Sequence, residues 1–216
     1  MSRSPSFKPL GKRIFDLSPP IGSPMPYYPG DAIFRAQPIC TIEKSGCNMH
    51  LLEMGTHTGS HVDAPLHFLK GGRSVDQIAL DRFIAEVEVL EIRSKEIHPE
   101  HLHRLSEGVE GVLFKTLNSE YMSLGFFWRD YVHLTLEAAE KAIERGLRLI
   151  GIDYVSVERF GTRDFLVHKR LLEAGIVLLE GLTLKDVPPG RYILFAFPLR
   201  LKGMDGSPVR AVLIEP

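Results

Sequence analysis

Cysteine is scarce in this 216-residue chain, and neither sign of charge is in excess. Two cysteines, Cys40 and Cys47, are too few for a disulfide framework, so we expect reduced thiols in a cytoplasmic protein rather than a Cys40–Cys47 bridge. The formal net charge of −1 gives no electrostatic footprint for nucleic acid or an anionic membrane. No apolar run reaches the roughly 18 residues of a membrane span, and the polar residues 1–6 lack the apolar core of a secretory signal.

What is present is typical of one globular domain, and we expect a single domain over residues 1–216. Hydrophobic residues make up 44% of the chain and charged residues 25%, and no repeat or low-complexity linker interrupts it. Residues 16–31 hold five of the 15 prolines and must form an irregular, extended loop. This loop is either a stiff surface segment or a pocket wall in which Tyr27 or Tyr28 presents an aromatic face.

Strand-like and helix-like segments alternate along the rest of the chain. Thr135 is a suitable N-cap and Gly146 a suitable stop for a helix over 135–145, and Gly175 closes a short helix over 168–173. Consecutive strand segments are too frequent for a regular doubly wound sheet, so we predict an α/β fold with a mixed sheet. The predicted strands cover residues 48–54, 83–92, 111–116, 147–153, 176–180, 191–198 and 209–215.

The most informative segment is residues 57–67, which hold His57, His61, Asp63 and His67. Imidazole nitrogens and carboxylate oxygens are the ligands that zinc-like and manganese-like ions prefer. Three of the chain's nine histidines fall in this segment. Several imidazoles packed together are hard to satisfy without a cation, so the segment predicts half of a metal site.

The same residues indicate how this segment must fold. Gly59 weakens a helix there and Pro65 ends one. An extended strand would separate His57 from His61 by roughly 13 Å, whereas two ligands of one ion lie within about 3–4 Å of each other. We therefore expect a curled loop or a single tight turn.

A second histidine group, at His98, His101 and His103, has a different setting. Its surroundings are charged and contain no glycine. Pro99 is well placed for the first position of a helix, so this group predicts a solvated helix start and no metal site.

The second half of the site is expected near Glu180 and His168. Glu180 ends the apolar run 176–179, and a carboxylate at the tip of a buried strand is costly unless it is paired or bound to metal. A helix, a turn at Gly175 and the returning strand can bring His168 close to Glu180. The alternative is a surface glutamate at a strand end.

With these residues in place, the chain resembles the cyclase-type metal-dependent hydrolases, which include bacterial kynurenine formamidase and isatin hydrolase. The family pattern is H-x-G-T/S-H-x-D-x-P-x-H, and residues 57–67 match every fixed position. The resemblance covers nearly the whole chain. It continues through residues 16–18, 28–31, 151–153, 168–172, 179–182, 197–199 and 205–211.

The resemblance implies roles for the residues quoted above. His57, His61 and Asp63 would bind a first metal ion, and Asp63 would bridge to a second ion held by His168 and Glu180. The expected metal is zinc, as one or two ions, with manganese as the alternative. His67, beside the metals, would be the general base or acid. The fold would be the family's swivelling β/β/α domain, assembled as a homodimer or a dimer of dimers.

The implied activity is metal-dependent hydrolysis of an amide-type C–N bond, in an aryl formamide such as N-formylkynurenine or in a cyclic amide. The first substrate would place the enzyme in tryptophan catabolism. A lyase or cyclase acting on a small carbonyl acid and a non-catalytic metal-dependent binding protein stay open as alternatives. His67 favours an enzyme, because proton transfer needs it and metal affinity does not. The absence of a Gly-x-Ser-x-Gly motif argues against a serine esterase.

Departures from the family bear on the substrate. Tyr28, the expected substrate contact, stands where formamidases often have tryptophan, and Glu158 stands where the family tends to have aspartate. Aromatic residues able to line an aryl pocket, or to pack in a core or a dimer interface, are Tyr27, Tyr28, Phe126, Phe127 and Trp128.

Overall fold

The computed structural model describes residues 12–216 and is built around one curled, mixed sheet. Its central strands pair in parallel, and antiparallel strands flank them on both sides. The strand order is β1 (Ile14–Asp16), β13 (Val212–Ile214), β11 (Gly190–Phe195), β5 (Ile84–Glu91), β7 (Gly111–Lys115), β9 (Leu149–Ile152), β10 (Val177–Glu180), β4 (His61–Asp63) and β12 (Gly206–Pro208).

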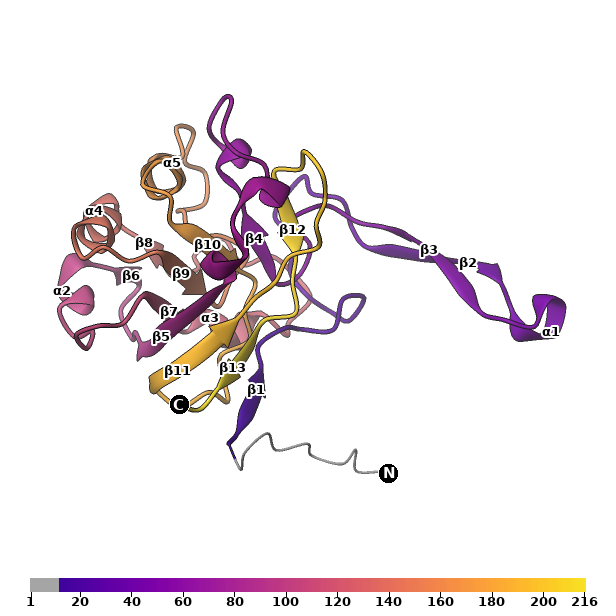
Figure 1. Cartoon of the computed structure of the whole chain (residues 1–216), viewed down its shortest axis with the longest axis horizontal. Coiled ribbons are helices and arrows are strands. Elements are labelled where there is room, and N and C mark those ends of the chain that lie inside the picture. The colour runs from indigo at the N-terminus through magenta and orange to yellow at the C-terminus, as the bar shows by residue number, and fades with distance from the viewer. Residues whose placement is uncertain (1–11) are drawn as a thin grey trace.

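Both faces of the central strands β7, β9 and β10 are buried, which explains their near-continuous apolar runs. Successive side chains alternate between the faces, so Val112 and Phe114 join one core cluster while Leu113 joins the other. Figure 1 shows that the helices α2 (Pro99–Leu102), α4 (Leu136–Glu144) and α5 (Leu166–Glu173) lie together on one side of the sheet. The other cluster includes Leu113 together with residues of β4, β5, β11 and β13, among them Val62, Val87, Leu194 and Leu213.

The predicted α/β class with a mixed sheet is confirmed, with shifts at the element ends. Thr135 caps α4 by accepting a hydrogen bond from Ala138 N at 3.1 Å. The helix predicted over 168–173 begins earlier, at Leu166, after Phe165 in a left-handed conformation (φ 49°). The strands predicted at 191–198 and 209–215 are shorter, at 190–195 and 212–214.

The second histidine group forms the predicted helix start. Pro99 begins the short helix α2, and His98 N donates to His101 Nδ1 at 2.9 Å. Its neighbours are the two-stranded pair β6 (Glu96–Ile97) and β8 (His133–Leu134), while α3 (Asn118–Tyr121) follows β7.

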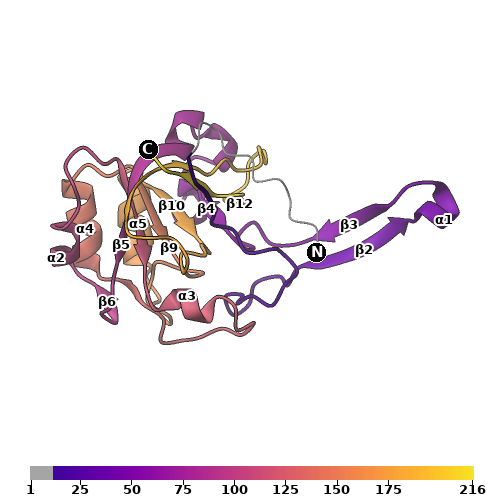
Figure 2. The same cartoon turned by 90° about the horizontal axis from the view of Figure 1, so that it is seen from below.

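A long hairpin, here called the arm, projects from this body. It consists of β2 (Arg35–Cys40), the single-turn helix α1 (Ile42–Ser45) and β3 (Met49–Glu53), and Figures 1 and 2 show it extending away from the sheet in both views. Every residue of β3 is exposed. The strand predicted over 48–54 is confirmed, but its projection into solvent was not foreseen. Cys40 and Cys47 are free thiols at the tip, with their Sγ atoms 3.4 Å apart.

Within residues 12–216, no helix combines the length and apolarity that a membrane crossing needs. The polar segment at residues 1–6, interpreted above, lies outside the described part of the chain.

Candidate metal centre

The histidine-rich segment curls and then straightens. Thr58 N donates to Gly55 O at 3.3 Å, and Gly59 takes the left-handed conformation (φ 70°) that closes the turn. The predicted curl is therefore present between residues 55 and 60. The strand β4 follows directly, and its alternating geometry puts His61 and Asp63 on the same face. This short strand was not predicted.

The neighbouring strand supplies the opposite side of the centre. In the antiparallel pairing of β4 with β10, Glu180 is the partner of His61. His61 Nε2 lies 3.4 Å from Glu180 Oε2 and 3.6 Å from Asp63 Oδ1. His168, on helix α5, places its Nε2 3.3 Å from Glu180 Oε1 and 3.8 Å from Asp63 Oδ2. His57 Nδ1 lies 2.9 Å from Asp63 Oδ1. The structure thus brings five of the predicted site residues to one point.

Each of the three imidazoles at this point is held from behind by an oxygen atom. Such contacts fix the orientation of an imidazole and its protonated nitrogen, and they are usual for histidines that bind metal. The three contacts leave one nitrogen of each ring directed at the centre. They are His57 Nε2 to Asp205 Oδ2 at 2.9 Å, His61 Nδ1 to Gly59 O at 2.9 Å, and His168 Nδ1 to Glu158 Oε2 at 3.0 Å.

The charges of the centre stabilise one another. Burial lowers the pKa of His57, but the hydrogen bonds that its ring donates to Asp205 and Asp63 outweigh this effect and raise the pKa to about 10. Burial likewise opposes the effect of Glu158 and Glu180 on His168, whose pKa also rises to about 10. For Asp63, burial favours the neutral acid, yet the contact with His57 holds the pKa well below its usual range. The contacts with the surrounding histidines therefore keep the Asp63 carboxylate ionised despite its burial.

The donor set fits a divalent metal ion. Asp63 is only 1% exposed, and its Oδ2 has no hydrogen-bond partner among residues 12–216. A buried carboxylate oxygen without a partner is costly, and a cation at that position would satisfy it. Imidazole nitrogens and carboxylate oxygens are suitable ligands for such an ion.

A cavity of about 410 Å³ opens above the centre. Tyr28 lines it from the proline-rich loop, where Asp31 N donates to Tyr28 O at 3.0 Å and closes a turn. Phe68 and Phe165 form an apolar wall, with ring centroids 4.9 Å apart. His67 also borders the cavity, at the end of a 3-10 turn over Pro65–His67. The proline-rich loop is therefore a pocket wall as well as a surface segment.

The other predicted aromatic residues have different positions. Tyr27 turns its hydroxyl to accept a hydrogen bond from Phe34 N at 3.4 Å. Phe127 packs within its own chain, 5.4 Å from the Tyr28 ring, whereas Phe126 and Trp128 are 51% and 39% exposed. Only part of the 126–128 cluster is therefore free for an interface.

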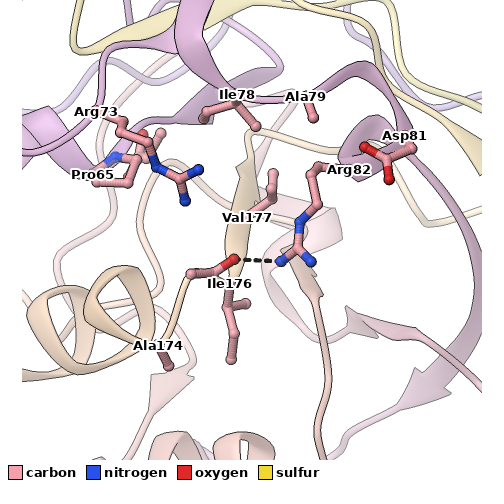
Figure 3. A pocket seen from close by; sticks show the side chains of 11 residues that line it. Pro65, Arg73, Ile78, Ala79, Asp81, Arg82, Ala174, Ile176 and Val177 are labelled. Atoms are coloured by element: carbon pink, nitrogen blue, oxygen red, sulfur yellow. Dashed lines mark hydrogen bonds between the residues drawn. The ribbon is translucent and has the colours of Figure 1, made fainter.

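A second cavity, of about 340 Å³, lies beside the carboxyl end of α5 (Figure 3). Arg73 and Arg82 border it, together with apolar side chains such as Ile78 and Val177. The Arg82 guanidinium donates to Gly175 O, so it caps the helix end and serves the fold.

Two residues of the site were not predicted. Asp205 contacts His57 and His67, and Glu158 holds His168 through both its ring Nδ1 and its backbone N. Asp205 begins segment 205–211, which is part of the resemblance to the cyclase-type hydrolases. Glu158 stands where that family tends to have aspartate. Nothing in their spacing indicated contact with the histidines.

The fold and the site together define a cyclase-type protein. Residues 15–159 match the family model described as putative cyclase, and the chain belongs to this family. It is 41% identical over 175 residues to the kynurenine formamidase of Salinibacter ruber, covering 79% of this chain and 82% of that protein. It is 35% identical over 205 residues to the kynurenine formamidase of Bacillus thuringiensis subsp. konkukian, covering 92% and 95%.

Solved structures agree with the predicted cyclase-like fold. A potential metal-dependent hydrolase with cyclase activity superposes with a TM-score of 0.82 at 32% identity, covering 95% of this chain and 100% of that one. Isatin hydrolase A from Labrenzia aggregata gives a TM-score of 0.81 at 28% identity, with 94% and 93% covered. The resemblance found in the sequence is confirmed.

Proposed function

We propose that this protein is a metal-dependent hydrolase of amide-type, non-peptide C–N bonds. Its first candidate substrate class is an aryl formamide such as N-formylkynurenine, and the second is a cyclic amide such as isatin. One observation carries the proposal: donor atoms of five residues converge beneath a cavity with aromatic walls. The similarity to kynurenine formamidases supports the first substrate class, and the similarity to isatin hydrolase supports the second.

The proposed ligands of a first ion are His57, His61 and Asp63, and a second ion would lie between Asp63, His168 and Glu180. Two groups of three donors have atoms within 4.8 Å of one another: His57, Asp63 and His67 form one, and His61, Asp63 and Glu180 form the other. Asp63 belongs to both groups, which supports a bridging role for this carboxylate, and His168 joins the second group through its 3.3 Å approach to Glu180. Zinc is the proposed metal and manganese the alternative. A divalent ion supplies Lewis acidity, polarising a carbonyl and easing loss of a proton from water near neutral pH.

His67 is the proposed proton carrier. Its Nδ1 lies 3.1 Å from Asp205 Oδ2, which leaves Nε2 available to a water molecule or a substrate in the cavity. Water attacks the carbonyl carbon as its proton passes to His67. The imidazole then returns the proton to the nitrogen as the C–N bond breaks. An aryl formamide would yield formate and an arylamine.

The aromatic wall is the proposed seat of the aryl ring. Phe68 and Phe165 offer ring faces beside His168, and Tyr28 closes the cavity from the loop. Aromatic pairs gain about 0.5–1.5 kcal/mol beyond the area that they bury. Selectivity for aryl over alkyl formamides follows from this wall.

A hydrolysis screen tests the proposal. Purified protein loaded with zinc or manganese is assayed on an aryl formamide, on isatin and on an alkyl formamide, with chelator-treated protein as the blank. We expect metal-dependent turnover of the aryl formamide or isatin and much weaker turnover of the alkyl analogue. No turnover above the blank on either aryl substrate would contradict the proposal.

We also propose that the protein forms a homodimer or a dimer of dimers through the arm. A two-stranded hairpin is only marginally stable alone in water, yet this arm exposes Leu51 and Leu52 to 56% and 54%. Apolar side chains on an unsupported hairpin need a second surface, and another copy of the chain supplies it in a closed, symmetric way. Light scattering that gave one chain mass, near 24.3 kDa, at micromolar concentration would refute the dimer.

The remaining proposals concern organisation and location. One domain over residues 1–216 is supported by a sheet that contains both β1 and β13. The low cysteine content of the chain, with only Cys40 and Cys47, supports a reducing compartment such as the cytoplasm. Limited proteolysis that released a stable half, or recovery of the native protein from an oxidising compartment, would contradict these two points.

A further inference from the structure

Asp205 contacts two histidines, His57 and His67, that both line the cavity. Its Oδ2 is 2.9 Å from His57 Nε2 and 3.1 Å from His67 Nδ1. Its other oxygen, Oδ1, accepts a hydrogen bond from Thr56 Oγ1 at 3.1 Å. The rings of His57 and His67 are stacked, with centroids 3.9 Å apart and planes at 29°. One carboxylate oxygen therefore orients two rings that have different proposed tasks.

The main chain holds Asp205 in this place. Ala64 N donates to Asp205 O at 2.9 Å, and the next residue, Gly206, pairs with Asp63 in the β12–β4 ladder. A Cβ on Gly206 would lie only 2.7 Å from His57 Cε1, so glycine there lets the imidazole pack against the strand. Because the ladder fixes the backbone, a change of the Asp205 side chain alters the contacts to the rings without requiring the loop to move.

The two contacts have separable consequences. With its Nε2 bound to Asp205, His57 directs Nδ1 at Asp63 and the centre. With its Nδ1 bound to Asp205, His67 directs Nε2 at the cavity. A carboxylate behind a metal-binding imidazole is worth about 10–100-fold in metal affinity or activity. A carboxylate behind a general base holds the imidazole in the reactive tautomer and orientation.

We propose that Asp205 is a positioning residue that couples metal retention at His57 to proton transfer at His67. This inference rests on the proposed function, because the tasks of the two histidines are part of it. Removal of the carboxylate weakens both at once, whereas replacement of His67 alone affects only proton transfer.

The first arm of the test is a zinc titration of metal-stripped protein against a chromophoric chelator. Asp205→Asn is expected to raise the zinc dissociation constant by about 10–100-fold. The matched control is Asp76→Asn, because Asp76 Oδ1 accepts from Gly203 N at 2.9 Å and so holds the same loop from outside the centre. This control should stay within about twofold of the parent protein.

The second arm is a double-mutant cycle with His67→Ala, measured as kcat at saturating zinc. In the parent background, Asp205→Asn should lower kcat by about 10²-fold, within the range for general acid–base catalysis. In the His67→Ala background it should lower kcat by less than about threefold, while its effect on zinc affinity persists. Melting temperatures of the metal-stripped variants verify that each one folds.

An unchanged zinc dissociation constant in Asp205→Asn would overturn the inference, as would losses of kcat that multiply in the double variant. An equal loss of zinc affinity in Asp76→Asn would also overturn it, since the loop rather than the carboxylate would then be responsible. If the parent protein hydrolyses no substrate, the proposed function fails, but the zinc titration still decides whether Asp205 supports the metal-binding ring.

Discussion

The arm and the metal centre are neighbours in sequence and opposites in environment. All of β3, from Met49 to Glu53, is exposed, whereas all of β4, from His61 to Asp63, is buried. The arm leaves leucine side chains in water. The centre holds His61 and Asp63 at 1% exposure and Glu180 at 3%.

Both arrangements reverse the usual distribution, in which charged groups stay in water and large apolar groups leave it. Each region therefore supports one of the proposed binding partners. A second protein surface would bury the apolar groups of the arm, and a divalent cation would satisfy the carboxylates of the centre. The proposed homodimer would complete one of these regions and the proposed divalent ion the other, although they lie only a few residues apart in the sequence.

The largest expected effect on the centre comes from His67→Ala. Because the ring borders the cavity and contacts Asp205, its loss should lower turnover by about 10²–10⁴-fold while metal content and fold are retained. Steady-state kinetics with metal analysis of the same sample measures both. Turnover at the parent rate would show that His67 has only a structural role. Loss of the metal would show that His67 is a metal ligand.

On the arm, the double substitution of Leu51 and Leu52 by glutamate should dissociate the proposed dimer. Burying two charges in place of apolar contacts is expected to weaken association by about 30-fold or more. Sedimentation velocity over a concentration series measures the change. Leu80→Glu is a matched control, since Leu80 is 69% exposed on the body of the protein. Equal dissociation by the control, or none by the arm variant, would break the comparison.

A smaller effect is expected from Gly206→Ala. The added Cβ would stand 2.7 Å from His57 Cε1 and 2.9 Å from Val62 O, so it would displace the ring from the centre and strain the β12–β4 pairing. Zinc affinity should fall by about tenfold. Gly55→Ala is the control on the same curl, because its Cβ would meet Thr58 Oγ1 at an ordinary 3.6 Å. Similar affinities for both variants would show that the position of His57 is not critical.

The smallest effect is expected at the cavity wall. Tyr28→Leu should raise KM for an aryl formamide by about 2–10-fold with little change in kcat, since it removes an aromatic contact and no reacting group. Tyr27→Leu, which alters the neighbouring residue outside the cavity wall, should leave KM unchanged. A loss of kcat in Tyr28→Leu would instead assign Tyr28 to the chemistry.

The sequence predicted the residues that converge on the centre better than the residues that orient them. The curl at 55–60 and the approach of His168 to Glu180 follow from local rules, namely glycine freedom and a helix-turn-strand return. Asp205 was missed because it reaches His57 only through the pairing of β12 with β4, a contact between distant segments. Residue spacing carries no signal for such a pairing.

The arm was missed for a different reason. A strand over 48–54 was predicted, but alternation along a strand does not reveal whether either face packs against its own chain. The apolar residues Met49 and Leu51 look like core residues in sequence and are more than half exposed in the structure. Only the tertiary arrangement distinguishes the two cases.

The most direct test of the central claim is the metal content of Asp63→Asn, measured by inductively coupled plasma mass spectrometry on purified protein. Asp63 is shared by both groups of donors, so its replacement should leave less than a tenth of the roughly one or two ions per chain expected for the parent. Glu53→Gln, a carboxylate change on the arm, should keep the full amount. Near-stoichiometric metal in Asp63→Asn would contradict the account.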